Sequence, residues 1–162
     1  MATTYQPIET QTLGSNAASL TFTSVPSTYT DIVLEFSYPS SGTSGYQIGL
    51  RFNGDTGSNY SATVMYGETS TGSARTSNLS YARTGHAAGT TSFVMRCNIQ
   101  NYSNSTTCKS VIARNGVVNT GVYETVALWR STSAITSITI MIDGGTLPAG
   151  AIATIYGIKA AA

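Results

Sequence analysis

Hydrophobic and polar residues alternate over much of this chain, which is the pattern of half-buried β-strands. The segment DIVLEFSY places Ile32, Leu34, Phe36 and Tyr38 on one face. The same period of two recurs in YQIGLRF (46–52), YSATVMY (60–66), FVMRCNI (93–99) and SITIMI (137–142). Further strand candidates lie at 20–25, 109–114, 124–130 and 151–158. No segment shows a helical stripe, so the pattern predicts a chain of short strands.

Strands of this kind, joined by turns rich in Gly, Ser, Asn and Pro, are typical of sandwiches and jelly rolls. The apolar face of each strand needs a second sheet about 10 Å away to cover it. We therefore expect an all-β fold, a single-domain antiparallel β-sandwich that is jelly-roll-like and has eight to ten strands. The chain of 162 residues is long enough for one core, and no repeat or linker divides it.

One long segment between the predicted strands does not alternate. Residues 68–91 are polar and Gly-rich, and we expect them to form a long surface loop. Arg75, Tyr81 and Arg83 within this segment are of residue types that make contacts at protein interfaces. The plainer alternative is a flexible surface excursion that contains one weak extra strand near residues 79–81.

The N-terminal residues 1–10 allow two interpretations. They fit an extended arm that reaches a neighbouring subunit, with Tyr5 and Pro7 among its contacts, and they fit equally the first edge strand of a sheet. The segment is polar and has no apolar core of a signal peptide, so we expect synthesis in a cytoplasm.

The composition is unusual in its shortage of charge. Charged residues make up 9% of the chain, far below the usual quarter, and the net charge is +1. Nucleic-acid and membrane partners normally need a clustered basic surface, so we expect neither. A surface this poor in charge is more typical of a subunit within a large assembly.

The residues needed for catalysis or metal binding are scarce. His86 is the one histidine of the chain and lies in RTGHAAG, without a nucleophile motif beside it, so we expect an exposed loop histidine without a role. Two cysteines and one histidine do not supply a zinc site. The seven carboxylates form no recognisable pair, although distant strands can bring two together. We expect no cofactor and no enzyme activity.

The two cysteines lie in CNIQNYSNSTTC, which reads as a β-hairpin with its tip near Tyr102 and Ser103. In a hairpin symmetric about that tip, Cys97 and Cys108 face each other closely enough for a disulfide. A reducing cytoplasm argues against the bond. Cys97 also alternates with apolar residues, so a buried free thiol is an equally natural outcome.

The stretch RFNGDTGSNYS (51–61) is the densest cluster of Asn, Asp and Gly. It does not fit an EF-hand, which needs Gly at the sixth position, Glu at the twelfth and flanking helices. Asn-Gly is a strong signal for a tight hairpin, and Asp55 and Asn59 can bond the backbone of the turn. We expect a structured hairpin between two strands, with a calcium site of another type at Asn53–Asn59 as the alternative.

Four stretches of the chain carry a family resemblance. They read MATTYQPIETQTLGSNAASLTFTSVPSTYTDIVLEFS, RFNGDTGSNYSATVMYG, ALWRSTSAITSITI and GTLPAGAIATIYGIKA. Together they resemble small virion proteins of tailed bacteriophages, especially phages of aquatic bacteria and cyanobacteria. The resemblance runs nearly end to end and is weakest over residues 68–120. It implies a place in the virion and no catalytic residues.

From the resemblance and the composition we expect a head decoration, or cement, protein of a bacteriophage. Its partners are then the major capsid protein or other virion proteins, and it is expected to be a homo-oligomer that adds modest interfaces many times over. The alternative is a tail or fibre component that binds a host receptor or glycan. That alternative predicts an exposed aromatic platform, for which Tyr81, Tyr102 and Tyr123 are the candidates.

Overall fold

A computed structural model describes residues 5–40, 47–86 and 91–159 of the chain. These residues form twelve β-strands and no helix long and apolar enough to cross a membrane. The strands are β1 (Tyr5–Thr12), β2 (Ser19–Phe22), β3 (Asp31–Tyr38), β4 (Gln47–Phe52), β5 (Tyr60–Gly67), β6 (Thr71–Leu79), β7 (Ala82–His86), β8 (Phe93–Ile99), β9 (Lys109–Val117), β10 (Gly121–Trp129), β11 (Ile138–Ile142) and β12 (Ile152–Ile158).

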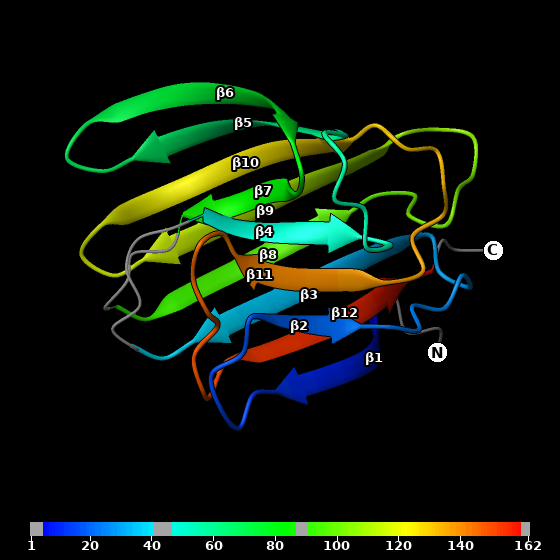
Figure 1. Ribbon diagram of the computed structural model, residues 1–162, viewed down its shortest axis with the longest axis horizontal. Helices are drawn as coiled ribbons and strands as arrows, with labels where there is room; N and C mark the ends of the chain where they lie inside the picture. Colours follow the sequence, from blue (N-terminus) through cyan, green and yellow to red (C-terminus); the bar gives the residue numbers. More distant parts are fainter. Residues whose placement is uncertain (1–4, 41–46, 87–90, 160–162) are drawn as a thin grey trace.

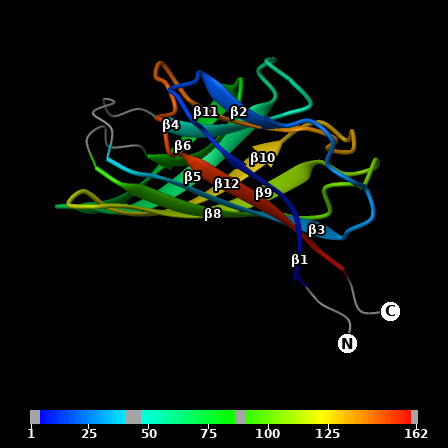
Figure 2. The ribbon, with the colours of Figure 1, turned by 90° about the horizontal axis from the view of Figure 1, so that it is seen from below.

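The strands form two antiparallel sheets that pack face to face. The large sheet has eight strands in the order β1-β12-β3-β8-β9-β10-β5-β6, and the small sheet has four in the order β2-β11-β4-β7. Figure 1 shows the small sheet in front of the large one, and Figure 2 shows the two layers edge on. This is the predicted all-β, jelly-roll-like antiparallel sandwich, with twelve strands in the described ranges where eight to ten were expected.

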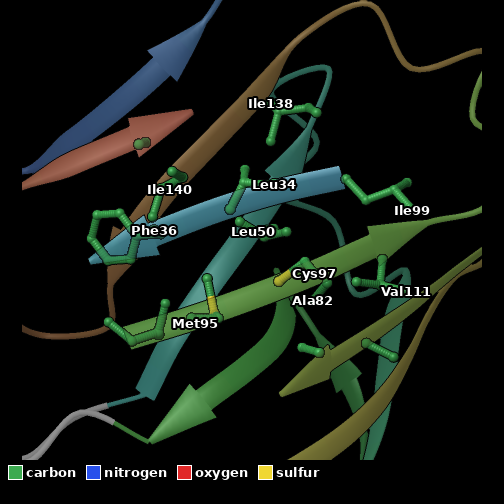
Figure 3. Close-up of a cluster of buried hydrophobic side chains, with 14 of the residues drawn as sticks. Leu34, Phe36, Leu50, Ala82, Met95, Cys97, Ile99, Val111, Ile138 and Ile140 are labelled. Carbon is green, nitrogen blue, oxygen red and sulfur yellow. The ribbon is translucent and has the colours of Figure 1, made fainter. Parts of the chain in front are cut away.

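The core lies between the sheets and uses the alternating residues that the sequence pattern selects. Leu34, Phe36 and Met95 reach it from the large sheet, and Leu50 and Ile140 reach it from the small sheet (Figure 3). Each of these side chains is at most 4% exposed. Full burial of one such side chain contributes about 1.5–3 kcal/mol, so the interface between the sheets dominates the stability of the fold.

The prediction of a long polar loop at 68–91 is wrong. Most of this segment is β6, which pairs with β5, and β7, which pairs with β4, while residues 87–90 lie outside the described ranges. Of the weak strand expected near 79–81, Leu79 is the last residue of β6, and Ser80 and Tyr81 form the bend between β6 and β7. The pattern misses β6 because none of its residues is buried, so no position along it needs an apolar side chain.

The N-terminal strand β1 forms one edge of the large sheet, as the second interpretation of residues 1–10 predicts, while residues 1–4 lie outside the described ranges. Its pairing with β12 shifts at a bulge between Pro7 and Glu9. Proline cannot donate a ladder hydrogen bond, and bulges twist an edge away from further pairing. This edge of the sheet is therefore protected against the addition of another strand.

Candidate functional site

The side of the large sheet that faces away from the small sheet, which we call the outer face, carries exposed apolar side chains. They are Met65, Val94, Val122, Val126, Leu128 and Ile152. Val94 is 61% exposed and Val122 is 67% exposed. Neighbouring exposed apolar side chains on the surface of a folded domain can mark an interaction site. The outer face is therefore the best candidate for a binding site.

The strand register arranges the outer face in rows that run across the sheet. One row, from β5 to β12, reads Met65, Glu124, Arg114, Arg96, Glu35 and Thr154. The adjacent row reads Gly67, Val122, Gly116, Val94, Ser37 and Ile152. A charged row thus lies directly beside an apolar row.

The two rows line a depression of about 860 Å³ on the outer face. We call this depression the hollow. Gly67 and Gly116 keep it open, because neither residue adds a side chain to the apolar row. A Cβ atom at Gly67 would meet Val122 at 3.8 Å, and one at Gly116 would meet Val94 at 3.9 Å, both ordinary van der Waals distances. Neither glycine has a positive φ. Both positions therefore accept a larger side chain, which makes them suitable for blocking the hollow.

The charged row is neutral as a whole. Arg96 and Arg114 lie directly opposite each other on β8 and β9. Each is also paired with a glutamate on its other neighbouring strand, Arg96 with Glu35 on β3 and Arg114 with Glu124 on β10. Nη1 of Arg96 lies 3.3 Å from Oε1 of Glu35, and Nε of Arg114 lies 3.2 Å from Oε1 of Glu124. Such exposed pairs contribute at most about 1 kcal/mol each to stability. Because each arginine is neutralised by a glutamate, the row favours geometric recognition of a polar partner over general attraction of an anion or a cation.

Tyr5 is the predicted contact residue that lies nearest to the hollow. Its hydroxyl oxygen accepts a hydrogen bond of 3.0 Å from Nη2 of Arg96, and the Arg96 guanidinium lies 5.6 Å from the centre of the ring. The side chain is still 46% exposed. Tyr5 thus holds one of the arginines of the charged row and leaves part of its ring for a partner.

Of the other predicted contact residues, Arg75 shares the outer face with Tyr5, because it lies opposite Thr63 of β5, whereas Tyr81 and Arg83 do not. Arg75 is exposed on β6, and Arg83 is half-buried on β7 in the other sheet. Tyr81 is 7% exposed, and its hydroxyl donates a 2.9 Å hydrogen bond to Oδ2 of Asp143. The prediction of Tyr81 as a contact residue is therefore wrong, because the ring is packed inside the fold.

The predicted aromatic platform is also wrong for all three of its candidates. Tyr81, Tyr102 and Tyr123 are 7%, 0% and 6% exposed. Their rings fill the core or its ends, while their hydroxyls reach hydrogen-bond acceptors, which in the case of Tyr102 is the carbonyl of Pro26. Tyrosine suits such positions because it has an apolar ring and one polar atom at its tip.

His86 is not the exposed loop residue that the sequence predicts. It ends β7 and is half-buried, with Nδ1 3.1 Å from the hydroxyl oxygen of Tyr123. That hydroxyl donates a 2.6 Å hydrogen bond to Oε1 of Glu68, so the imidazole N–H is the donor toward Tyr123. Burial lowers the pKa of His86, and Glu68 partly opposes this effect. The three side chains link the two sheets at one end of the sandwich.

The predicted hairpin at 51–61 is wrong in its topology. β4 belongs to the small sheet and β5 to the large one, so this loop crosses between the layers. The local turn is as expected, with φ of 52° at Asn53 and 69° at Gly54. Asn53 also accepts hydrogen bonds from the backbone amides of Thr136 and Ser137, at 2.8 and 3.1 Å. Its side chain thus anchors a second loop.

The carboxylate of Asp55 is occupied by protein donors. It accepts hydrogen bonds from the Gly57 amide at 2.8 Å, from Nδ2 of Asn59 at 3.0 Å and from the indole N–H of Trp129 at 2.7 Å. These bonds lower the pKa of Asp55, and the bond from Trp129 contributes most. Within the described ranges no three His, Cys, Asp or Glu residues lie close enough to hold a metal ion. Asp55 and Asn59 are therefore bonded within the turn, as the sequence predicts.

The predicted disulfide does not form, because both cysteines are free. Cys97 is buried and lies opposite Ala113, whereas Cys108 is exposed and precedes β9. The β8–β9 pairing is therefore centred two to three residues beyond the expected tip. The alternative of a buried free thiol at Cys97 is confirmed.

Sequence reasoning did not select the residues of the hollow. The signal was present in segments such as GVYETVALW, where Val122, Val126 and Leu128 alternate with Tyr123 and Ala127 and make both faces of β10 apolar. A strand that is apolar on both faces of a two-layer sandwich has one face without a partner sheet. This feature points to a binding surface.

Comparisons with known proteins leave the family of the chain open. No protein-family model and no curated protein matches it. Among solved structures, a galectin from Caenorhabditis elegans, LEC-6, is 11% identical, with a TM-score of 0.37 over 93% of this chain and 96% of the galectin. A PL-14 alginate lyase from Aplysia kurodai is 10% identical, with a TM-score of 0.38 over 85% of this chain and 72% of the lyase. Likenesses at this level carry no information about what this chain binds.

Proposed function

We propose that this protein is a non-catalytic structural subunit of a larger particle and that it docks onto a protein partner through the hollow. The observation that carries the proposal is the apolar row beside the paired charges, in which Val94 and Val122 are more than half exposed. Burying such aliphatic side chains against a partner contributes about 25 cal/mol per Å² of apolar surface. A subunit that lives within an assembly keeps this surface covered.

The resemblance to virion proteins suggests which particle this is. On that basis we place the protein on the head of a tailed bacteriophage, as a decoration protein that contacts the major capsid protein. The low charge of the chain is in keeping with permanent residence among other subunits. In this setting the hollow receives an apolar side chain of the capsid protein, and the charged row meets polar groups around it.

The tail or fibre alternative, in which the protein binds a glycan, has less support. Sugar rings are usually held by stacking on exposed aromatic side chains, whereas the aromatic residues that line the hollow, Phe36, Tyr66 and Tyr123, are buried or half-buried. The tyrosines expected to form a platform are buried. Aliphatic side chains fit a protein partner better, so we carry the protein-docking function forward alone.

The experiment is a co-sedimentation assay of purified protein with phage heads assembled without it. The wild-type protein should pellet with the heads, and Val94→Asp and Val122→Asp should each lower the bound fraction at least tenfold because a carboxylate would be desolvated in the apolar row. Gly116→Phe should do the same by filling the hollow. Met141→Asp, on the outward side of the small sheet, is the matched control and should bind like wild type.

All four variants should keep the wild-type far-UV circular dichroism spectrum, because the changed side chains point away from the core. If the heads bind Val94→Asp and Gly116→Phe as well as the wild type, the hollow is not the docking site. If the wild type itself does not bind, the proposed role on the head is wrong.

A further inference from the structure

The second edge of the large sheet, formed by β6, is open. β6 is the outermost strand, and its side away from β5 pairs with no strand among the described residues. In Figure 1 it lies at the top of the molecule, beyond β7, the nearest edge of the small sheet. None of its nine residues is buried, so both of its faces meet solvent. An open edge of this kind presents a row of backbone groups that can pair with another chain.

The other three edges of the sandwich are less suited to pairing. β1 has a proline and a bulge, β2 has four residues, and β7 has five residues with a register shift beside it. β6 pairs regularly with β5 from Thr71 to Ser77, and its irregularity is confined to the far end, where Asn78 has a φ of 59°. The chain therefore protects three edges and leaves one long, regular edge open.

We infer that β6 pairs with β6 of a second copy of this chain, antiparallel and across a two-fold axis centred on Ala74. Seven residues, 71–77, then pair on each side, which is the full regular part of the strand. In this register Arg75 lies opposite Ser73 of the second copy. A register centred on Arg75 would set two guanidinium groups directly opposite each other, which is destabilising.

The side chains along this edge match themselves in the same register. Thr71 lies opposite Ser77 and Gly72 opposite Thr76, so small polar residues meet small polar residues. Hydroxyls that face each other across strands already bond in this fold, with 3.0 Å between Thr10 and Thr154 and 3.0 Å between Thr21 and Thr139. Arg75, the one charged residue in segment 71–79, does not face Arg75 of the second copy. These features favour a second copy over an unrelated strand as the occupant of the edge.

Pairing of this kind joins two large sheets into one continuous sheet. Because the two-fold axis is perpendicular to the sheet, the outer faces of both copies point in the same direction. The dimer would then present two hollows to one surface. This inference stands on the β6 edge alone and does not depend on the function proposed for the hollow.

Cysteine cross-linking tests the register. In a Cys108→Ser background, which removes the exposed thiol, Ala74→Cys should be linked into a dimer by a short bismaleimide, because Ala74 lies opposite its own copy. Ser77→Cys is the control on the same exposed strand, and it should not be cross-linked, because residue 77 lies opposite Thr71 of the second copy. If Ser77→Cys is linked as efficiently as Ala74→Cys, or if neither is linked, the register is wrong.

Proline substitution tests the dimer itself. Neighbouring amides of β6 point alternately toward β5 and toward the open edge, so one of Ser73→Pro and Ala74→Pro keeps the β5 pairing. We expect the variant with the melting temperature closer to wild type to be monomeric by light scattering, at concentrations where the wild-type chain is dimeric. A wild-type mass of one chain at all concentrations would overturn the inference.

Discussion

The substitution Asp55→Ala should cost far more stability than its place in a surface loop suggests. The Asp55 carboxylate is the acceptor for the indole N–H of Trp129, at 2.7 Å, and Trp129 is 2% exposed. The same carboxylate accepts the Gly57 amide that closes the turn. Alanine therefore leaves a buried donor without a partner and loosens the loop that crosses between the two sheets.

The size of the effect follows from these bonds. An unpartnered buried donor costs about 1–3 kcal/mol, and loss of the turn bond adds about 1 kcal/mol. We expect the free energy of unfolding to fall by about 2–4 kcal/mol. For a domain of this size each kcal/mol lowers the melting temperature by about 2–4 °C, so the melting temperature should fall by roughly 4–16 °C.

The assay is urea unfolding followed by far-UV circular dichroism, with the free energy obtained by linear extrapolation. A double-mutant cycle with Trp129→Phe should give a coupling energy of about 1–2 kcal/mol, because the phenyl ring has no N–H to lose. A free energy of unfolding within about 0.5 kcal/mol of wild type for Asp55→Ala would refute the reasoning.

The same carboxylate predicts a dependence on pH. Hydrogen bonding, first of all from Trp129, lowers the pKa of Asp55 in the folded state. Its stabilising effect is therefore complete above the unfolded value of about 3.9 and is lost as the pH falls through the folded pKa. The stability difference between wild type and Asp55→Ala should be constant near neutral pH and should shrink below about pH 4.

Three further predictions follow from buried polar groups. Lys109→Met should lower the free energy of unfolding by about 1–3 kcal/mol, because the buried Lys109 ammonium donates to two loop carbonyls at 2.6 and 3.1 Å; an unchanged urea midpoint would contradict this. Cys108 should react with a thiol reagent in the native protein, and Cys97 only after unfolding, because burial raises the pKa of the Cys97 thiol; equal rates would be inconsistent with the fold. Because burial lowers the pKa of His86, stability should fall as the pH drops below about 6.5, and His86→Gln should remove part of this fall in melting temperature between pH 7 and pH 5.

The fold class was predictable because the core imposes its period directly on the sequence. In β3 and β8 every inward position is apolar and buried, as the alternation requires. β6 was not predictable in this way, because a strand exposed on both faces needs no alternation of apolar and polar residues. Its existence depends on backbone pairing with β5, which almost any sequence of small polar residues allows.

Local chemistry was easier to predict than connectivity. Asn53 and Gly54 adopt the positive φ values expected of a tight turn, and Asp55 bonds the turn as predicted. The same signal could not show that the next strand joins the other sheet, because that choice is made by long-range packing. In the same way, the spacing of Cys97 and Cys108 could not reveal that the loop between β8 and β9 is asymmetric.

The hollow could not be predicted from the sequence for a different reason. Each of its residues occupies an ordinary strand position, and only the register across β5, β10, β9 and β8 brings Val122, Gly116 and Val94 into one row. A sequence contains the alternation within a strand but not the order of the strands. The candidate site therefore became visible only once the sheet order was known.

The measurement that tests the central claim most directly is the number of copies of this protein per virion, obtained by quantitative mass spectrometry of purified particles. A structural subunit that decorates the head should be present in a fixed, small-integer ratio to the major capsid protein. A handful of copies per particle would place it on the tail, and its absence from purified virions would contradict the proposed function altogether.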